Sequence, residues 1–315
     1  MFVLVTGGAG FIGSHTVESL LAQGHRVRVL DDLSTGCRDN LPAHHAALNF
    51  VQGDVRDEAC VGRCMEGITH VLHLAAQVSV PVSVQEPVRS HAINVVGYLN
   101  VLNAARLAGV IRVVHASSAA VYGVPVSLPL TEDSPVVPLS PYGLGKLILD
   151  QYAHLFGELY GLSTLGLRYF NVYGPRQDPG SPYSGVISKF SSLAIQGSPL
   201  TICGDGLQTR DFIFVKDVAR ANCAALLSPA RGTVNVATGQ SVTLLELVQI
   251  LALCLGHPVD ALHVPASVGD VPHSSTLPLR MRNELEVLDT VMLRDGLAQL
   301  LTHLSSTSSN TARYS

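Results

Sequence analysis

The amino-acid sequence predicts an α/β fold in which helices cover both faces of a parallel sheet. The first observation is an apolar run at residues 2–5 that leads, through a glycine-rich turn, into a helical pattern at residues 11–23. The second is that strand-like apolar runs and helical patterns then alternate as far as residue 170, which is the order that parallel sheets require. We therefore expect a doubly wound, Rossmann-type sheet whose ligands bind beyond the carboxyl ends of its strands.

Length and composition indicate a globular chain without strong charge. The chain has 315 residues, of which 47% are hydrophobic and 14% charged, so it can bury a large core. A formal net charge of -4 without a long basic run argues against nucleic acid or an anionic membrane as a partner. No apolar run approaches the roughly 18 residues of a membrane span, and we expect no signal peptide. The histidines and cysteines form no metal-binding pattern, so we expect a cytoplasmic enzyme without a metal.

The turn between the first strand and the first helix is a candidate cofactor site. Its sequence, TGGAGFIG, fits both glycine spacings of the dinucleotide fingerprint. Glycines let the chain turn tightly and let a ligand approach the backbone, while the helix start directs N–H groups and a positive dipole end at one spot. These features suit a pyrophosphate, and we expect contacts from Gly7, Gly10, Phe11, Ile12 and Gly13.

The second predicted strand, residues 26–30, ends at an acidic residue. Asp31 lies eighteen residues after Gly13, where this motif places the acid that binds the adenosine ribose. A carboxylate there accepts hydrogen bonds from the 2′-hydroxyl and repels a 2′-phosphate. We therefore expect NAD in preference to NADP, the alternative being that Asp31 is an acid in a surface loop.

Two further strands extend the predicted cofactor site. The third, residues 48–51, precedes Asp54 and Val55, and Asp54 either touches the adenine side of the dinucleotide or caps the next helix. The fourth, residues 70–76, ends in small residues, among them Ala75, that allow close approach of the cofactor.

The remaining pattern divides the chain into two domains and a tail. We expect a helix at 87–107, a strand at 111–115 that runs on to the serines at 117–118, a loop at 123–141, a helix at 142–160 and a strand at 164–170. Beyond them, loops at 177–185 and 197–208 interleave with helices at 186–196, 216–227 and 244–255. We expect residues 1–170 to form the NAD-binding domain, with later segments returning to it, residues 171–304 to form mainly the substrate domain, and residues 305–315 to be disordered.

Three side chains supply the parts of a hydride-transfer site. The helix at 142–160 places Tyr142 and Lys146 one turn apart on one face. A phenol with a pKa of about 10 is a poor base at neutral pH, and a neighbouring ammonium lowers that pKa. The hydroxyl of Ser118, at the end of the fifth strand, can bond a substrate hydroxyl and relay its proton.

At these motifs the chain resembles the extended short-chain dehydrogenase/reductases that act on nucleotide sugars, and among them the UDP-hexose 4-epimerases. The resemblance spans roughly residues 3–227 and rests on TGGAGFIG at 6–13, HLAA at 73–76, SSAAVYG at 117–123, PYGLGK at 141–146, RYFNVYGPR at 168–176 and RDF at 210–212. It implies Tyr142 as base, Lys146 on the nicotinamide ribose and Ser118 as proton relay. It also implies that Asn171 and Arg210 lie on the nucleotide diphosphate.

One position separates the subgroups of that family. In its sugar dehydratases and glucuronate decarboxylases, an acidic residue lies just before the Val-Tyr-Gly segment. This chain has Ala119 and Ala120 there. A site with tyrosine, lysine and serine but no further acid can oxidise and re-reduce a carbinol, which favours epimerisation through a transient 4-keto sugar.

The resemblance continues weakly into GDVPHS at 269–274, where Asp270 and Ser274 are expected on the substrate. In related epimerases a tyrosine aligned with Ser274 restricts the pocket to plain hexoses, whereas a small residue leaves room for an N-acetyl group. Ser274 therefore predicts UDP-GlcNAc/UDP-GalNAc interconversion, with UDP-Glc/UDP-Gal as a second pair, unless the short stretch is misaligned. Ser267 departs from the arginine that often contacts the diphosphate in relatives. Either Arg210 and Arg176 suffice for the phosphates, or the C-terminal part binds the nucleotide sugar differently.

The resemblance also bears on assembly and on the alternatives that stay open. The helices expected at 87–107 and 142–160 carry apolar faces whose family equivalents pair as a homodimer, although such faces could also be internal core. A 4-ketoreductase, a UDP-glucuronate 4-epimerase and a non-catalytic NAD-sensing protein on the same fold are alternative functions. An epimerase would suit polysaccharide biosynthesis or galactose use, between which the sequence does not decide.

Overall fold

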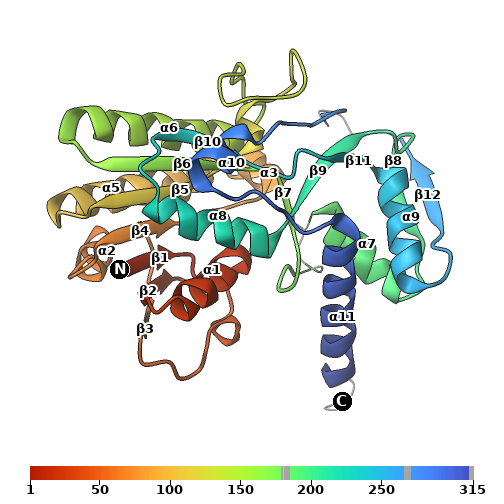
Figure 1. The fold of residues 1–315 in the computed structure, drawn as a ribbon, viewed down its shortest axis with the longest axis horizontal. Coiled ribbons are helices and arrows are strands. Elements are labelled where there is room, and N and C mark those ends of the chain that lie inside the picture. The colour runs from red at the N-terminus through yellow and green to blue at the C-terminus, as the bar shows by residue number, and fades with distance from the viewer. Residues whose placement is uncertain (179, 181–184, 266–270, 312–315) are drawn as a thin grey trace.

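The computed structural model describes residues 1–178, 180, 185–265 and 271–311 (Figure 1). A seven-stranded sheet in the order β10-β6-β5-β4-β1-β2-β3 lies at its centre, and every neighbouring pair in it is parallel. Its strands are β1 (Phe2–Thr6), β2 (Arg26–Asp31), β3 (Leu48–Gln52), β4 (His70–His73), β5 (Arg112–Ser118), β6 (Ser163–Tyr169) and β10 (Gly232–Val236). The expected doubly wound parallel sheet is confirmed.

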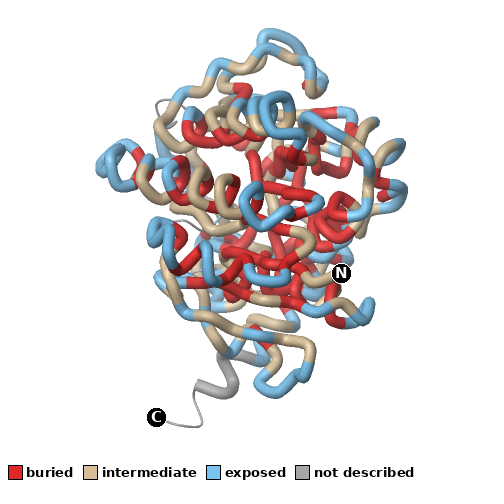
Figure 2. Tube along the Cα trace, turned by 90° about the vertical axis from the view of Figure 1, so that its left-hand side faces the viewer, coloured by how far each residue is buried: buried red, intermediate tan, exposed pale blue. Residues whose placement is uncertain are grey.

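Helices cover both faces of this sheet and bury two separate hydrophobic clusters. One cluster lies under α1 (Phe11–Ala22), α8 (Val215–Leu227) and α10 (Leu279–Leu285). The other lies under α2 (Glu58–Cys64), α5 (Gly97–Leu107) and α6 (Pro141–Tyr160). Figure 2 shows buried residues gathered inside the molecule with exposed turns around them. Because both faces are covered, the central strands are continuous apolar runs, and that is why the sequence pattern reveals them.

The strand order reverses at β1, which pairs with β2 on one side and β4 on the other. A crevice forms at such a switch point beyond the carboxyl ends of the strands. Here the chain passes very closely, because a Cβ added at Gly7 would lie 2.7 Å from the backbone nitrogen of Ala75. The glycine turn is therefore in direct contact with the segment just after β4.

A second group of elements, on the right of Figure 1, is built on two small sheets. One has the order β11-β9-β7 and the other pairs β12 with β8. The elements are β7 (Asn171–Tyr173), α7 (Val186–Ile195), β8 (Leu200–Cys203), β9 (Thr209–Phe214), β11 (Ser241–Thr243), α9 (Leu244–Leu255), β12 (Ala261–Val264) and α11 (Leu293–Thr311). In the described part of the chain, no helix has both the length and the apolar character needed to cross a membrane.

Three expectations from the sequence are wrong in detail. The helix expected at 87–107 is interrupted, and the segment before it is also helical. These segments are α3 (Val80–Gln85), α4 (Pro87–His91), the π-helical η2 (Ala92–Val96) and α5. Inside η2 the buried Asn94 bonds the backbone of Gln77 through both its oxygen and its nitrogen, at 2.8 and 3.0 Å. This tie coincides with the wider helical turn, a feature that often marks functional regions.

The other two differences lie in the second group of elements. The loop expected at 197–208 contains β8, because Leu200 and Ile202 alternate with outward residues and are buried. Of the tail expected to be disordered at 305–315, residues 305–311 instead continue α11 to Thr311, and residues 312–315 lie outside the described residues. That helix is anchored by Leu297, Leu300 and Leu301, which are buried in the hydrophobic core of this group. Short 3₁₀ turns at η1 (Arg38–Asn40) and η3 (Ala119–Val121) complete the described elements.

Candidate active site

The glycine turn between β1 and α1 fits a pyrophosphate. A Cβ added at Gly13 would lie 2.1 Å from the carbonyl oxygen of Gly7, so the turn tolerates no side chain there. Gly7 itself has a φ of +68°, in the left-handed region that glycine adopts without strain. Gly10 occupies the N-cap of α1 and has no side chain to cover the helix start. Backbone N–H groups and a positive helix end are thus presented at the switch point, which is what a dinucleotide phosphate requires.

Asp31 fastens this turn to the end of β2. Its Oδ2 accepts a hydrogen bond from the Ala9 N–H at 2.9 Å, and its Oδ1 accepts one from the Leu33 N–H at 2.9 Å. Burial raises the pKa of the carboxyl above its usual value, and these two hydrogen bonds act in the opposite direction. The acid is therefore in the expected place beside the glycine turn rather than in a free surface loop, and its contact with a ribose stays a prediction.

Asp54 and Val55 lie at the end of β3. The Asp54 carboxylate pairs with Arg56, with 2.9 Å between Nε and Oδ2, and this hydrogen bond lowers the pKa of the carboxyl. The alternative that Asp54 caps the next helix is wrong, because Asp57 is the cap of α2 and accepts from the Cys60 N–H at 3.0 Å. Val55 is buried.

Helix α6 and strand β5 bring the three predicted reactive side chains together. Ser140 caps α6 by accepting from the Gly143 N–H at 3.1 Å, so the helix begins just before Tyr142. One turn later the buried Lys146 donates from Nζ to the carbonyl oxygen of Ala116 in β5, at 2.7 Å. The Lys146 Nζ lies 5.9 Å from the centre of the Tyr142 ring.

Ser118 completes the group at the carboxyl end of β5. Its Oγ accepts from the Ala120 N–H at 3.1 Å, which caps η3 and fixes the side chain. Burial raises the pKa of the Tyr142 phenol, and a hydrogen bond with Ser118 acts in the lowering direction. Burial lowers the pKa of Lys146 to about 8, and the Asp150 carboxylate opposes that shift. The net direction for Tyr142 is opposite to the sequence-based expectation, because burial outweighs the hydrogen bond.

The predicted substrate residues divide into two groups. Asn171 in β7 donates from its side chain to the Asp211 carbonyl at 3.0 Å, beside Arg210 in β9. The backbone N–H of Ser274 donates to the Thr209 carbonyl at 3.1 Å, and this contact places Ser274 against the same strand. Asn171, Arg210 and Ser274 are thus gathered along β9.

Arg176 belongs to the other group. It has a positive φ of 68°, and its guanidinium forms an ion pair with Glu18 of α1. It is therefore turned toward the first helix. Asp270 and Ser267 lie outside the described residues.

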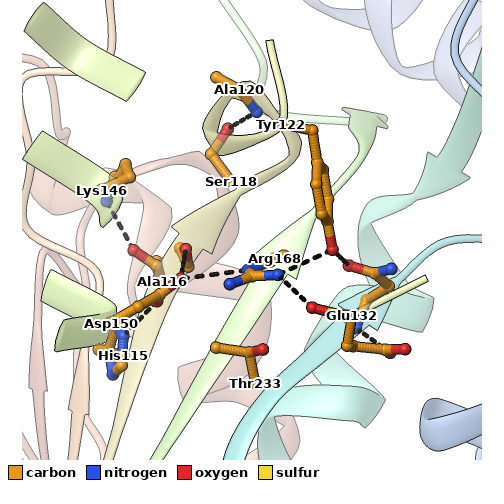
Figure 3. A network of polar contacts seen from close by, with 12 residues as sticks. His115, Ala116, Ser118, Ala120, Tyr122, Glu132, Lys146, Asp150, Arg168 and Thr233 are labelled. Atoms are coloured by element: carbon orange, nitrogen blue, oxygen red, sulfur yellow. Dashed lines mark hydrogen bonds and ion pairs between the residues drawn. The ribbon is translucent and has the colours of Figure 1, made fainter. Parts of the chain in front are cut away.

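Sequence reasoning missed a buried polar cluster behind Lys146, which Figure 3 shows. Asp150 of α6 accepts from Arg168 Nε at 3.1 Å and from Ser117 Oγ at 3.1 Å, and it contacts His115 Nε2 at 3.0 Å. A sequence signal existed, because Asp150 follows Lys146 by four residues and so shares its helix face. The partners on β5 and β6 had no such signal.

Comparison with known proteins agrees with this geometry. Residues 3–237 match the NAD dependent epimerase/dehydratase family. The chain is 42% identical over 308 residues to UDP-glucose 4-epimerase of Mycolicibacterium smegmatis, covering 95% of this chain and 97% of the relative.

Two solved structures are similar over nearly their whole length. UDP-N-acetylglucosamine 4-epimerase from Methanobrevibacter ruminantium, solved with UDP-N-acetylmuramic acid, is 37% identical with a TM-score of 0.93, covering 97% of this chain and 98% of that one. UDP-glucose 4-epimerase from Thermus thermophilus, solved with NAD, is 40% identical with a TM-score of 0.89, covering 97% and 99%. The expectation of an NAD-dependent epimerase is confirmed, and the chain belongs to the NAD dependent epimerase/dehydratase family of extended short-chain dehydrogenase/reductases.

Proposed function

We propose that the protein is a UDP-hexose 4-epimerase that interconverts UDP-GlcNAc and UDP-GalNAc and also accepts UDP-Glc and UDP-Gal. The observation that carries this proposal is the meeting of Tyr142, Lys146 and Ser118 at the carboxyl end of the sheet, on the same edge as the glycine turn. The relatives named as UDP-glucose and UDP-N-acetylglucosamine 4-epimerases support it.

In the proposed reaction the chain binds the sugar and moves one proton. The Tyr142 phenolate takes the proton of the sugar 4-hydroxyl, with the Ser118 hydroxyl bridging the two oxygens. The Lys146 ammonium stabilises the phenolate. NAD, when bound, accepts the hydride from sugar C4 and later returns it. The 4-keto sugar turns about its diphosphate link between the two transfers, so the hydride returns to the opposite face, Tyr142 gives back its proton, and no net oxidation occurs.

The segment after Ser118 supports epimerisation over elimination or decarboxylation. Those reactions need a further acid near the sugar, and Ala119 and Ala120 supply none. The carboxylate of Glu132, which follows in the next loop, accepts from the Asn235 N–H of β10 at 2.7 Å. It is therefore engaged in holding the loop to the sheet.

Ser274 supports the N-acetylated substrates. Its backbone is held on β9 through Thr209, and its carbonyl oxygen accepts from Ser241 Oγ at 3.0 Å. A short hydroxymethyl side chain at this anchored position leaves more room than a tyrosine. We propose that this room receives the 2-acetamido group.

A second copy of the chain is the proposed partner. Apolar side chains are exposed on η2, α5 and α6, namely Val96, Leu107, Leu155, Leu159 and Tyr160. Such a patch is typical of an interface between protein chains. We propose a cytoplasmic homodimer, for which light scattering after size-exclusion chromatography should give twice the 33.3 kDa chain mass.

A sugar panel tests the proposed function. Purified protein is incubated separately with UDP-Glc, UDP-GlcNAc and UDP-GlcA, and the epimers are separated by chromatography. We expect conversion of the first two, with NAD released from the purified protein only on denaturation. Conversion of UDP-GlcA alone would show the glucuronate epimerase, consumption of added reduced cofactor would show a ketoreductase, and no conversion of any sugar would refute the proposal.

A further inference from the structure

The buried cluster behind Lys146 contains a carboxylate that pairs with Arg168 and whose charge also acts on Lys146. Asp150 is 6% exposed at its side chain, and its ion pair with Arg168 is almost fully buried. The same carboxylate lies one helical turn after Lys146, on the same face of α6. A buried charge without a partner is strongly unfavourable. Asp150 is the ion-pair partner of Arg168, and its negative charge also raises the pKa of Lys146.

The carboxylate is held in one orientation. An ionised carboxylate only accepts hydrogen bonds, so His115 must donate its Nε2–H to Asp150 Oδ1 at 3.0 Å. His115 Nδ1, on the other side of the ring, is hydrogen-bonded to the Tyr98 hydroxyl at 3.0 Å. Ser117 and Arg168 bond Oδ2, each at 3.1 Å. The donors come from β5 and β6, so the rigid sheet fixes the anion.

Lys146 and Asp150 are also hydrogen-bonded to two consecutive residues of β5. Lys146 donates to the carbonyl of Ala116, and Asp150 accepts from the side chain of Ser117. Ser118 is the next residue along that strand. In Figure 3 both α6 side chains reach the end of β5 from the same side. The two contacts therefore set the position of Ser118 relative to the helix that carries Tyr142.

Other charged and titratable groups around this pair come from several neighbouring elements. They are His73 from β4, Tyr98 from α5, His115 from β5, Arg168 from β6, Tyr122 and Glu132 from the segment after Ser118, and Tyr142 from α6 itself. Burial lowers the pKa of His73, and the charge of Lys146 lowers it further. Arg168 Nη1 donates a hydrogen bond to the Tyr122 hydroxyl at 2.9 Å.

We propose that Asp150 is a positioning residue whose fixed carboxylate holds Lys146 as an ammonium beside Tyr142. The two cations respond differently to its loss. Burial lowers the pKa of Arg168, but Asp150 and Tyr122 outweigh burial and keep that pKa above its usual value. Burial brings the pKa of Lys146 to about 8 even with Asp150 present. Without the carboxylate, Lys146 is the group that gives up its proton. The Tyr142 phenol then has no adjacent cation and becomes a weaker acid.

The first test is the pH dependence of kcat/KM, and it rests on the proposed roles of Tyr142 and Lys146. On the acidic side of the pH profile, kcat/KM rises as Tyr142 loses its proton, and we call this part the phenolate limb. In Asp150→Asn, the phenolate limb should move to higher pH by about one unit. At a given pH on this limb the activity should fall roughly tenfold, and it should return at alkaline pH. Ser117→Ala is the matched control, because it removes one hydrogen bond of Asp150 and leaves the charge. It should leave the limb in place whatever it does to kcat. An unmoved limb in a folded Asp150→Asn variant overturns the proposal.

The second test needs no substitution and no turnover. The chain has three lysines, Lys146, Lys189 and Lys216, and the last two are exposed. In protein labelled with ¹³C at lysine, three side-chain signals can be followed against pH by NMR. The Lys146 signal should titrate below the usual lysine range yet show a charged side chain at pH 7, and a neutral Lys146 at pH 7 refutes the proposal. This NMR readout needs no sugar and no turnover. If a Tyr142→Phe variant kept its activity, that result would therefore count against the proposed catalytic roles and not against the role of Asp150.

Discussion

Arg176 and Glu18 form an ion pair between the loop after β7 and helix α1, with 2.5 Å between Nη2 and Oε1. The sequence predicted Arg176 as a phosphate ligand, but here its charge is matched within the protein. We expect Arg176→Met to raise the KM for the UDP-sugar less than about threefold, because the guanidinium is already paired with Glu18 and losing a partly exposed pair costs the fold only roughly 0–1 kcal/mol. Steady-state kinetics check this.

Arg210→Met provides the comparison for that experiment. Arg210 lies on β9 beside Asn171 and Ser274, and its loss should raise KM by more than tenfold, since charge-assisted hydrogen bonds to phosphate are worth about 1.5–3 kcal/mol. A larger KM effect from Arg176 than from Arg210 would show that the ion pair with Glu18 opens when substrate binds.

Replacing Tyr142 with phenylalanine separates an enzyme from a sensor. We expect kcat to fall by about 10²–10⁴, the usual contribution of a general base, while NAD binding measured by calorimetry changes little. Turnover within tenfold of the unaltered protein would show that the proton leaves by another group. Loss of NAD binding in a folded variant would show that the phenol serves the cofactor instead.

Selectivity for the sugar should respond to the size of residue 274. We expect Ser274→Tyr to lower kcat/KM for UDP-GlcNAc at least tenfold relative to UDP-Glc, because a phenol ring fills the space proposed for the acetamido group. Ser274→Ala is the control and should keep both activities. Equal losses on both sugars in the tyrosine variant would place Ser274 away from the sugar 2-position.

The glycine turn should not tolerate even a methyl group at Gly13. A Cβ there would overlap the Gly7 carbonyl oxygen at 2.1 Å, so Gly13→Ala should displace the turn and abolish retention of NAD. Acid extraction of the purified variant measures the cofactor. Gly62→Ala, in α2, is the matched control, because an added Cβ meets nothing within 4 Å. It should keep NAD and gain about 0.5–1 kcal/mol of stability.

The buried Lys146 makes the free energy of unfolding depend on pH. Its pKa is about 8 in the folded chain against a usual 10.5, so between these values the unfolded chain binds more protons. Stability should therefore rise with pH in this window, by at most about 1.4 kcal/mol per unit. Urea unfolding at several pH values, compared with Lys146→Met, isolates this contribution. A slope that is equal in both proteins would mean that Lys146 is not the source.

The cofactor region was predictable from sequence because patterns among residues close together in the chain define it. The central strands β1, β4, β5 and β6 of the large sheet are mostly buried and read as apolar runs. The glycine turn, Asp31 and the Tyr142–Lys146 pair are spaced by the geometry of single turns and helices. Their positions follow from short-range rules. The net pKa direction of Tyr142 did not follow, because burial depends on chain segments that are far apart in sequence.

Pairings between distant segments could not be predicted. Strand β8 pairs with β12 about sixty residues later, and the short, half-exposed β12 gives little apolar signal. Asp150 was on the helix face that the sequence singled out, yet its partners His115 and Arg168 come from two other elements. A helix period identifies one side of such a cluster and says nothing about the strands that complete it.

The return of β10 to the large sheet has a consequence for any fragment of this chain. β10 pairs with β6 along residues 232–236, and Asn235 within it bonds Tyr122 on one side and Thr276 on the other, at 2.7 and 3.2 Å. A gene cut after residue 170 would leave β6 as a bare edge with unmet backbone donors and acceptors, open to pairing with other chains. The large sheet of the cofactor domain is thus complete only after β10, when most of the chain has been synthesised. Truncation or domain exchange at residue 170 should therefore give aggregates.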